Sequence, residues 1–299
     1  MYQKAIAIGR TPELSLRVSA GVLNRVEMPH PETGQTLIVL ERNLIARLNK
    51  NQEFEPNWHL QPLGGSSRLN RPNKLLEIIK KFNFENSWAK ENQDFRLYIR
   101  PEDLAKVVEF TEYHFEHKET EVIRLNAKHE FYEELLECLG IYQKEHRTLQ
   151  QLIEQTSNIF NLSEEGLEQA IVFEPFDRKK FNDLEHLRHQ HPKTVHRIFN
   201  HIHRIKIKSE NIAHELINIG EELTDSVIEE AVALKKSRWR HLHDQDSRTQ
   251  ASGLLITPLT KLLEHYQKHP KKERGIFTHY ENYRMTESVA QILEKDLEP

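Results

Sequence analysis

Residues 176–208, FDRKKFNDLEHLRHQHPKTVHRIFNHIHRIKIK, decide how the second half of this chain folds. The stretch holds nine Lys or Arg residues and six His residues against three acids, a formal excess of six positive charges. The whole chain carries −4, so positive charge is concentrated here. Such a pattern is typical of a surface that binds a polyanion, and it contains no motif that predicts catalysis.

Within this stretch, steps of three and four residues predict a helix over residues 194–205, after a break at His191-Pro192. Arg197, His201 and Arg204 then share one face of that helix, and the isoleucines share another. A shorter helix is predicted over residues 181–190. The basic residues would therefore form one helical surface.

Only helices are predicted from residue 148 onward. Apolar residues from Ile212 to Leu234 recur in steps of three and four, which is typical of a buried helical stripe. Thr257-Pro258 is a typical helix start, with a hydroxyl cap and a proline in the first turn. The predicted helices cover residues 149–160, 163–172, 181–190, 194–205, 209–220, 224–240, 258–268 and 286–297.

The N-terminal part is predicted to be mixed. Strands over residues 15–28 and 36–41, separated by the turn at residues 29–34, predict a hairpin. Residues 51–71 are polar and predict a long loop. Two strand-then-helix units follow, over residues 95–115 and 121–139.

These patterns predict an α+β fold class, with a small mixed α/β N-terminal part followed by a predominantly helical C-terminal part. The predicted domains are a mixed α/β domain over residues 1–145 and a helical domain over residues 146–299. The apolar run near residue 1 is too short for a signal peptide, and no apolar stretch of the sequence is long enough to cross a bilayer. We therefore expect no membrane partner.

Cys138 is the single cysteine and lies in an apolar helical run, so we expect a buried thiol and no internal disulfide. This favours the cytoplasm. Charge is uneven along the chain: residues 101–175 hold 6 basic and 17 acidic side chains. Complementary acidic and basic regions indicate a protein partner or self-association.

The leading hypothesis is a non-enzymatic nucleic-acid-binding or regulatory protein without a cofactor or a metal ion. Lys and Arg would contact phosphates, and histidines would strengthen binding as the pH falls from about 7.5 to 6. A second basic cluster surrounds Trp239, whose ring is predicted to stack on bases or to lie in the core. The predicted nucleic-acid contacts are Arg178, Lys179, Lys180, Arg197, His201, Arg204, Lys206, Lys208, Lys235, Lys236, Arg238 and Arg240.

The alternative hypothesis is a protein-interaction module in which the acidic region 101–175 and the basic region 176–208 meet partners or each other. Two smaller patterns suggest ligands of other kinds. His186 and His189, spaced at i and i+3, suit a metal ion. The backbone amides of the segment Gly64–Arg68 could hold a phosphate with Arg68 nearby, although the segment lacks the P-loop spacing and also fits a plain flexible loop.

His243-Asp244 resembles the doublet of HD-domain metal phosphohydrolases, which bind divalent metals through a His, a His-Asp pair and a distant Asp. The resemblance implies His214 as the upstream ligand and Asp296 as the last one. A metal ion held there would polarise a phosphate and activate water. The chain departs from the family in having the basic run KKSRWRHL before the doublet, where the family has an apolar helix.

Overall fold

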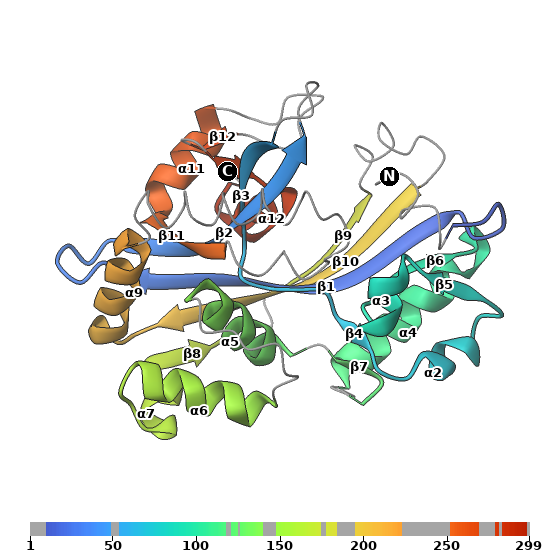
Figure 1. Ribbon diagram of the computed structural model, residues 1–299, viewed down its shortest axis with the longest axis horizontal. Coiled ribbons are helices and arrows are strands. Elements are labelled where there is room, and N and C mark those ends of the chain that lie inside the picture. The colour runs from blue at the N-terminus through green and yellow to red at the C-terminus, as the bar shows by residue number, and fades with distance from the viewer. Residues whose placement is uncertain are drawn as a thin grey trace. The chain divides into compact units, whose positions relative to one another are not determined.

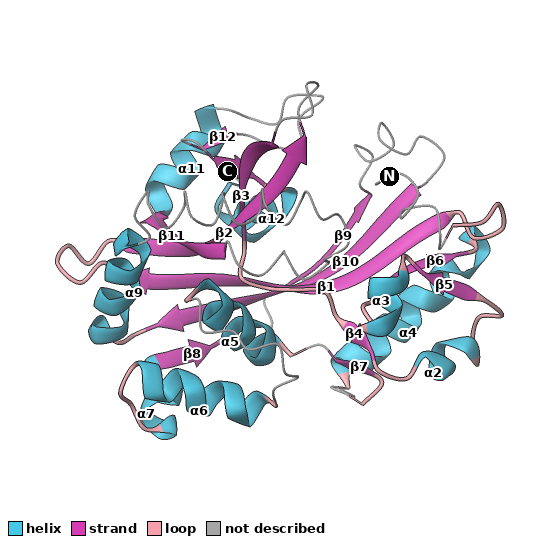
Figure 2. Ribbon diagram, in the orientation of Figure 1, coloured by secondary structure: helices cyan, strands magenta, loops and turns pink. Residues whose placement is uncertain are grey.

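A large β-sheet organises the part of the chain that the computed structural model describes (Figures 1 and 2). The described residues are 10–48, 54–117, 121–124, 126–139, 148–174, 178–183, 195–222, 252–268, 279–280 and 283–297. Among them, 11 strands share this sheet, whose central path has the order β12-β13-β3-β2-β1-β10-β8. A separate two-stranded sheet pairs β4 with β7.

The strands are β1 (Leu16–Pro29), β2 (Thr36–Leu48), β3 (Phe54–Gln61), β4 (Arg68–Leu69), β5 (Phe82–Phe84), β6 (Arg96–Ile99), β7 (Ile123–Arg124), β8 (Ile171–Phe173), β9 (Arg178–Asp183), β10 (Val195–Ile207), β11 (Ser252–Pro258), β12 (His279–Tyr280) and β13 (Tyr283–Met285). The helices are α2 (Pro72–Leu76), α3 (Ser87–Glu91), η1 (Pro101–Asp103), α4 (Leu104–Glu116), α5 (Ala127–Cys138), α6 (Leu149–Ile159), α7 (Glu164–Ala170), α9 (Glu210–Glu222), α11 (Leu259–Lys268) and α12 (Glu287–Leu297). None of these described helices is both long and apolar enough to cross a lipid bilayer.

Contacts divide the chain into two compact units. Unit 1 comprises residues 1–22, 64–127 and 177–202, and unit 2 comprises residues 23–63, 128–176 and 203–299. Two strands, β1 and β10, contribute residues to both units. The boundary at residue 145 stays a sequence-based prediction.

Unit 1 is built on β1, β6, β5 and the β9–β10 pair. β1 pairs antiparallel with β6, and β6 with β5. Its apolar core joins these strands to α2 and α4 and includes Val18, Phe95 and Phe199.

The segment Gly64–Arg68 runs beside β1 in unit 1, where Ser66 forms an antiparallel bridge with Gly21. The Val22 amide donates to the Gly65 carbonyl, and the Ser67 amide donates to the Ala20 carbonyl. A Cβ atom at Gly21 would lie 2.8 Å from the Gly65 oxygen, so only glycine permits this approach. The Ser66 hydroxyl accepts from Arg96 at 2.7 Å. These contacts tie the segment to β1 and its neighbours, and phosphate binding by the segment stays a prediction.

Unit 2 contains the predicted hairpin. Val26 of β1 pairs with Val39 of β2, and Gly34 in the connecting turn has φ +68°, which glycine adopts without strain. β2 also pairs antiparallel with β3 and β11, and β13 pairs in parallel with β3. The larger apolar core belongs to this unit and joins the strands to α5, α6, α7 and α9. Figure 1 shows α6 and α7 beside β8.

The prediction of a predominantly helical C-terminal part is wrong. Six strands, β8 to β13, come from residues after 170, and all belong to the large sheet. Residues 195–205 of the helix predicted over 194–205 belong to β10, and residues 181–183 of another predicted helix belong to β9. β10 is rich in isoleucine, and β-branched residues pack well on a pleated surface. Part of the predicted 51–71 loop is β3.

Other helix predictions are confirmed. α5, α6, α7, α9, α11 and α12 lie at the expected positions, with ends shifted by no more than two residues. Thr148 caps α6 through a capping box, and the Ser163 hydroxyl accepts from the Gly166 amide at the start of α7. Val289, Ile292 and Leu293 of α12 are buried, as their spacing predicts.

Candidate functional site

The predicted basic surface lies on two paired strands. In the β9–β10 register Lys179 stands opposite His201 and Lys180 opposite Asn200. Successive residues of a strand face opposite sides of the sheet, so these basic positions do not share one face as they would on a helix. His201 is buried, and its ring lies edge-on to Phe115 with centroids 4.3 Å apart.

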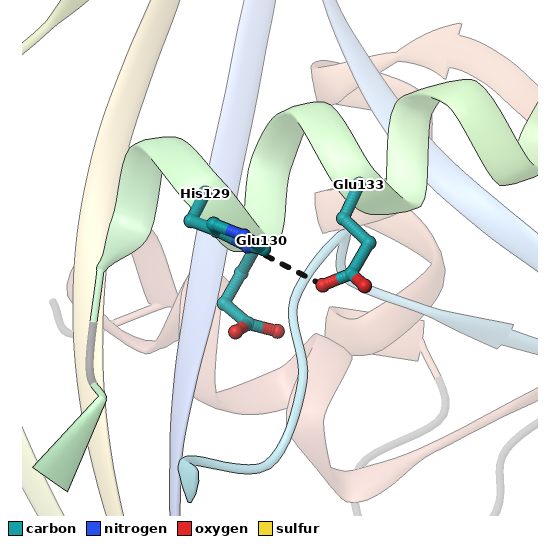
Figure 3. Close-up of side chains that lie close together, drawn as sticks. All are labelled: His129, Glu130 and Glu133. Carbon is teal, nitrogen blue, oxygen red and sulfur yellow. Dashed lines mark ion pairs between the residues drawn. The ribbon is translucent and has the colours of Figure 1, made fainter. Parts of the chain in front are cut away.

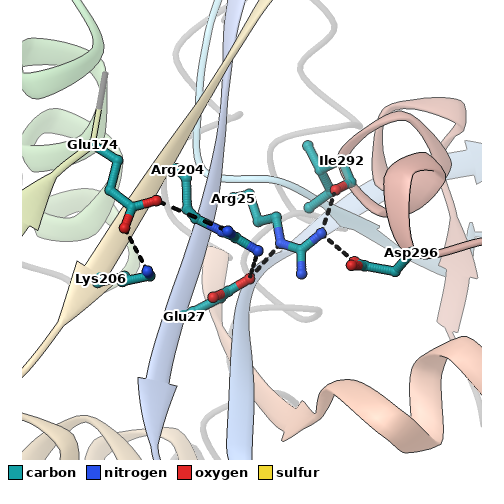
Figure 4. A network of polar contacts seen from close by, with 7 residues as sticks. All are labelled: Arg25, Glu27, Glu174, Arg204, Lys206, Ile292 and Asp296. Carbon is teal, nitrogen blue, oxygen red and sulfur yellow. Dashed lines mark hydrogen bonds and ion pairs between the residues drawn. The ribbon is translucent and has the colours of Figure 1, made fainter. Parts of the chain in front are cut away.

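Two of the predicted phosphate contacts in unit 2 are paired with acids (Figure 4). Arg204 lies 3.2 Å from Glu27 and 3.9 Å from Glu174. Lys206 forms an ion pair with the same Glu174 carboxylate. Burial lowers the pKa of His203 to about 4, so this residue stays neutral in the pH range where the histidines were expected to gain charge. Lys208 is exposed, and the predicted contacts at residues 235–240 lie outside the described residues.

The same network continues into the C-terminal helix through Arg25, a buried residue of β1. Its guanidinium donates to Glu27, to the Ile292 carbonyl at 3.2 Å and to Asp296 (Figure 4). Cations near a helix C-terminus also interact favourably with the helix dipole. These contacts hold α12 against β1.

The remaining sequence hypotheses are only partly covered by the structure. His214 lies exposed on α9, and Asp296 pairs with Arg25. His243, Asp244, His186 and His189 lie outside the described residues. The resemblance to HD-domain phosphohydrolases and the histidine-pair hypothesis therefore stay predictions.

A different group of side chains comes together on α5 in unit 2. This helix has the sequence AKHEFYEELLEC, with apolar residues packed in the core and a histidine and four glutamates between them. Cys138 at its end is buried, as expected, and burial raises the pKa of its thiol, which disfavours the nucleophilic thiolate.

His129, Glu130 and Glu133 point to one space beside α5 (Figure 3). Residues four apart on a helix lie one turn apart on the same face. The His129 Nδ1 atom lies 3.3 Å from Glu133, and one ligand atom from each of the three residues lies within 4.8 Å of the others. His129 and Glu130 are buried and Glu133 is partly buried. An imidazole and two carboxylates in this arrangement form a three-ligand set for a metal ion.

The carboxylates around this set repel one another. Burial, then Glu41 and Glu137, raise the pKa of Glu134, and burial, Glu41 and Glu133 raise the pKa of Glu137 to about 8. Glu41 lies on β2 two and four residues after Val39 and Leu37, which belong to the same core as α5. Since alternate residues of a strand share a face, Glu41 faces this helix too. A bound cation would relieve this repulsion.

Sequence reasoning missed this group although one signal was present. The spacing His129-Glu130-x-x-Glu133 on a confirmed helix puts two ligands at i and i+4, with a second carboxylate beside them. The contribution of Glu41 carries no such signal, because only the packing of β2 brings it near.

No protein-family model, no curated protein and no solved structure matches this chain.

Proposed function

We propose that this protein binds a divalent metal ion through His129, Glu130 and Glu133 of α5. The observation that carries this proposal is the convergence of their ligand atoms within 4.8 Å in a largely buried setting. The carboxylates of Glu41, Glu134 and Glu137 add negative charge around the three ligands.

The ligand types select the metal. Carboxylates alone suit Mg²⁺ and Ca²⁺, but an imidazole nitrogen favours Zn²⁺ or Mn²⁺ among common divalent ions. Bonds of about 2.0–2.2 Å in tetrahedral coordination place ligand atoms about 3.3–3.6 Å apart, so side-chain rotations of the three residues would have to bring their ligand atoms closer together. Three protein ligands leave a coordination position for water, whose pKa a bound zinc ion lowers toward neutrality.

The test is a calorimetric titration of chelator-stripped protein with ZnCl₂ and, separately, with MnCl₂, MgCl₂ and CaCl₂. We expect one ion per chain, with zinc or manganese at least tenfold tighter than magnesium or calcium. His129→Ala and Glu133→Gln should each lower the affinity at least tenfold.

Glu165→Gln is the matched control. Glu165 lies exposed on α7 of the same unit, so its substitution removes the same charge without touching the site. Equal affinity of the wild type, His129→Ala and Glu133→Gln proteins would overturn the proposal, as would the absence of any zinc or manganese binding. Far-ultraviolet circular dichroism of each variant shows whether a lost affinity reflects a lost fold.

A further inference from the structure

A second candidate site lies in unit 1, whereas the proposed metal site lies in unit 2. The two sites share no residues. Among the described residues, the exposed large hydrophobic side chains are Leu76, Ile78 and Tyr113, with 44%, 42% and 51% of their surface accessible. They come from α2, the turn after it and α4. Exposed apolar side chains that gather in one place mark interaction surfaces.

These elements line a cavity of about 370 Å³, a size typical of small-ligand and side-chain pockets. Its apolar wall is formed by Ile78 and by the rings of Phe110, Tyr113 and His114. The rings are held by each other: Phe110 and His114 lie edge-on at 4.4 Å, and Tyr113 stacks on His117 at 4.2 Å. The wall is therefore ordered by its own contacts before any ligand arrives.

The charged part of the wall is acidic. Glu77 and Glu109 line the cavity with one lysine, Lys74, which pairs with Glu77 at 3.1 Å. α4 as a whole carries three glutamates against one lysine. Aromatic rings beside carboxylates attract a cation that also has an apolar stem, which describes the side chains of arginine and lysine.

We propose that this cavity docks a basic segment of a partner protein, with one Arg or Lys side chain inserted between Tyr113 and Glu109. The aliphatic stem of that side chain lies on Ile78, and its charged end meets the Glu109 carboxylate. Charge complementarity argues for this occupant, because the two glutamates of the wall outnumber its single lysine and would disfavour an acidic segment. The proposal is independent of the metal site.

The test measures fluorescence anisotropy of labelled hexa-arginine, hexaglutamine and hexaglutamate peptides titrated with the full chain. We expect binding of hexa-arginine alone. Tyr113→Ala and Glu109→Gln should each weaken it about tenfold, whereas Tyr113→Phe, which keeps the ring, should retain most of the affinity. Tyr113 is half exposed, so these variants are expected to fold.

Glu102→Gln is the charge-matched control, since Glu102 is an exposed residue of η1 outside the cavity. An equal loss of affinity in Glu102→Gln and Glu109→Gln would mean that the peptide senses only overall charge and would overturn the proposal. Binding of hexaglutamine as tight as that of hexa-arginine would also overturn it. A dimer in sedimentation that Tyr113→Ala dissociates would assign the surface to a second copy of the chain instead.

Discussion

Arg204 and Lys206 of β10 and the glutamates of α5 belong to unit 2, yet the two groups of charges have different surroundings. Arg204 and Lys206 each meet a glutamate of unit 2. The glutamates of α5 meet one another and Glu41, and burial raises the pKa of Glu134 and Glu137. Charges that are already paired gain little from a ligand, whereas crowded like charges are stabilised by a bound cation. A count of charges along a sequence therefore does not show which of them lie beside an opposite charge in the fold and which lie beside a like charge.

Breaking the network of paired charges around Arg25, Glu27 and Arg204 should have the largest effect on stability. Arg25→Met removes a buried cation and leaves Glu27 and Asp296 without it, so we expect the free energy of unfolding to fall by about 3–5 kcal/mol. Urea denaturation followed by circular dichroism measures the change. Arg71→Met, which removes an exposed ion pair with Glu121, should cost less than about 1 kcal/mol. A comparable loss in both variants would mean that the Arg25 network contributes no more than a surface pair.

The stability of the protein should respond to zinc through the histidine and glutamates of α5. At a free zinc concentration of about 100 times Kd, binding to the folded state alone adds about 2.7 kcal/mol to the free energy of unfolding. We expect this gain in the wild type and a much smaller one in Glu133→Gln, measured as the shift in thermal midpoint with and without ZnCl₂. The same shift in both proteins would place zinc elsewhere on the chain.

Removing one carboxylate from the glutamates of α5 should stabilise the metal-free protein. The pKa of Glu137 is raised from 4.5 to about 8, so the folded protein keeps a proton that the unfolded chain loses above about pH 4.5. Stability is therefore lost as the pH rises from about 4.5 to 8. Glu137→Gln should add about 1–3 kcal/mol at pH 8 and little at pH 4.5, by urea denaturation in chelator. Equal effects at both pH values would show that the carboxyl titrates normally.

The smallest expected effect concerns the basic stretch, for which nucleic-acid binding stays a prediction. If it binds RNA or DNA, the affinity should fall steeply between about 50 and 200 mM salt. Lys208→Gln should reduce the slope of that dependence by about one, and Lys206→Gln by less, because Glu174 already neutralises Lys206. Anisotropy with a labelled 20-nucleotide RNA and DNA measures both. No binding at low salt would show that this interpretation is wrong.

The sequence predicted much of the helical structure and little of the sheet. The spacing in α5, α6 and α12 suits only a helix, and these helices are confirmed. In β10 the positions of Ile198, Ile202 and Ile205 fit a period of 3.6, but β-branched residues and partners from distant segments favour a strand. Sheet partners lie far away in the sequence, so local periodicity cannot identify them.

The candidate site shows the same limit. The sequence contains the ligand spacing of His129 and Glu133, because both lie on one helix. The crowding of carboxylates depends on Glu41, which reaches α5 only through the packing of β2. Charge counts along the chain found the excess of acid in residues 101–175 without showing which acids are buried together.

The parallel pairing of β3 with β13 has a consequence for the order in which the protein is made. β3 ends at Gln61, and its partner strand begins at Tyr283, roughly 220 residues later. At a synthesis rate of about 5–20 residues per second, the outer edge of β3 waits roughly 11–44 s on the ribosome for that partner. An unpaired strand edge is a template for pairing with other chains. Among the described strands, this edge is therefore the one at which a chaperone has the longest opportunity to bind the nascent protein.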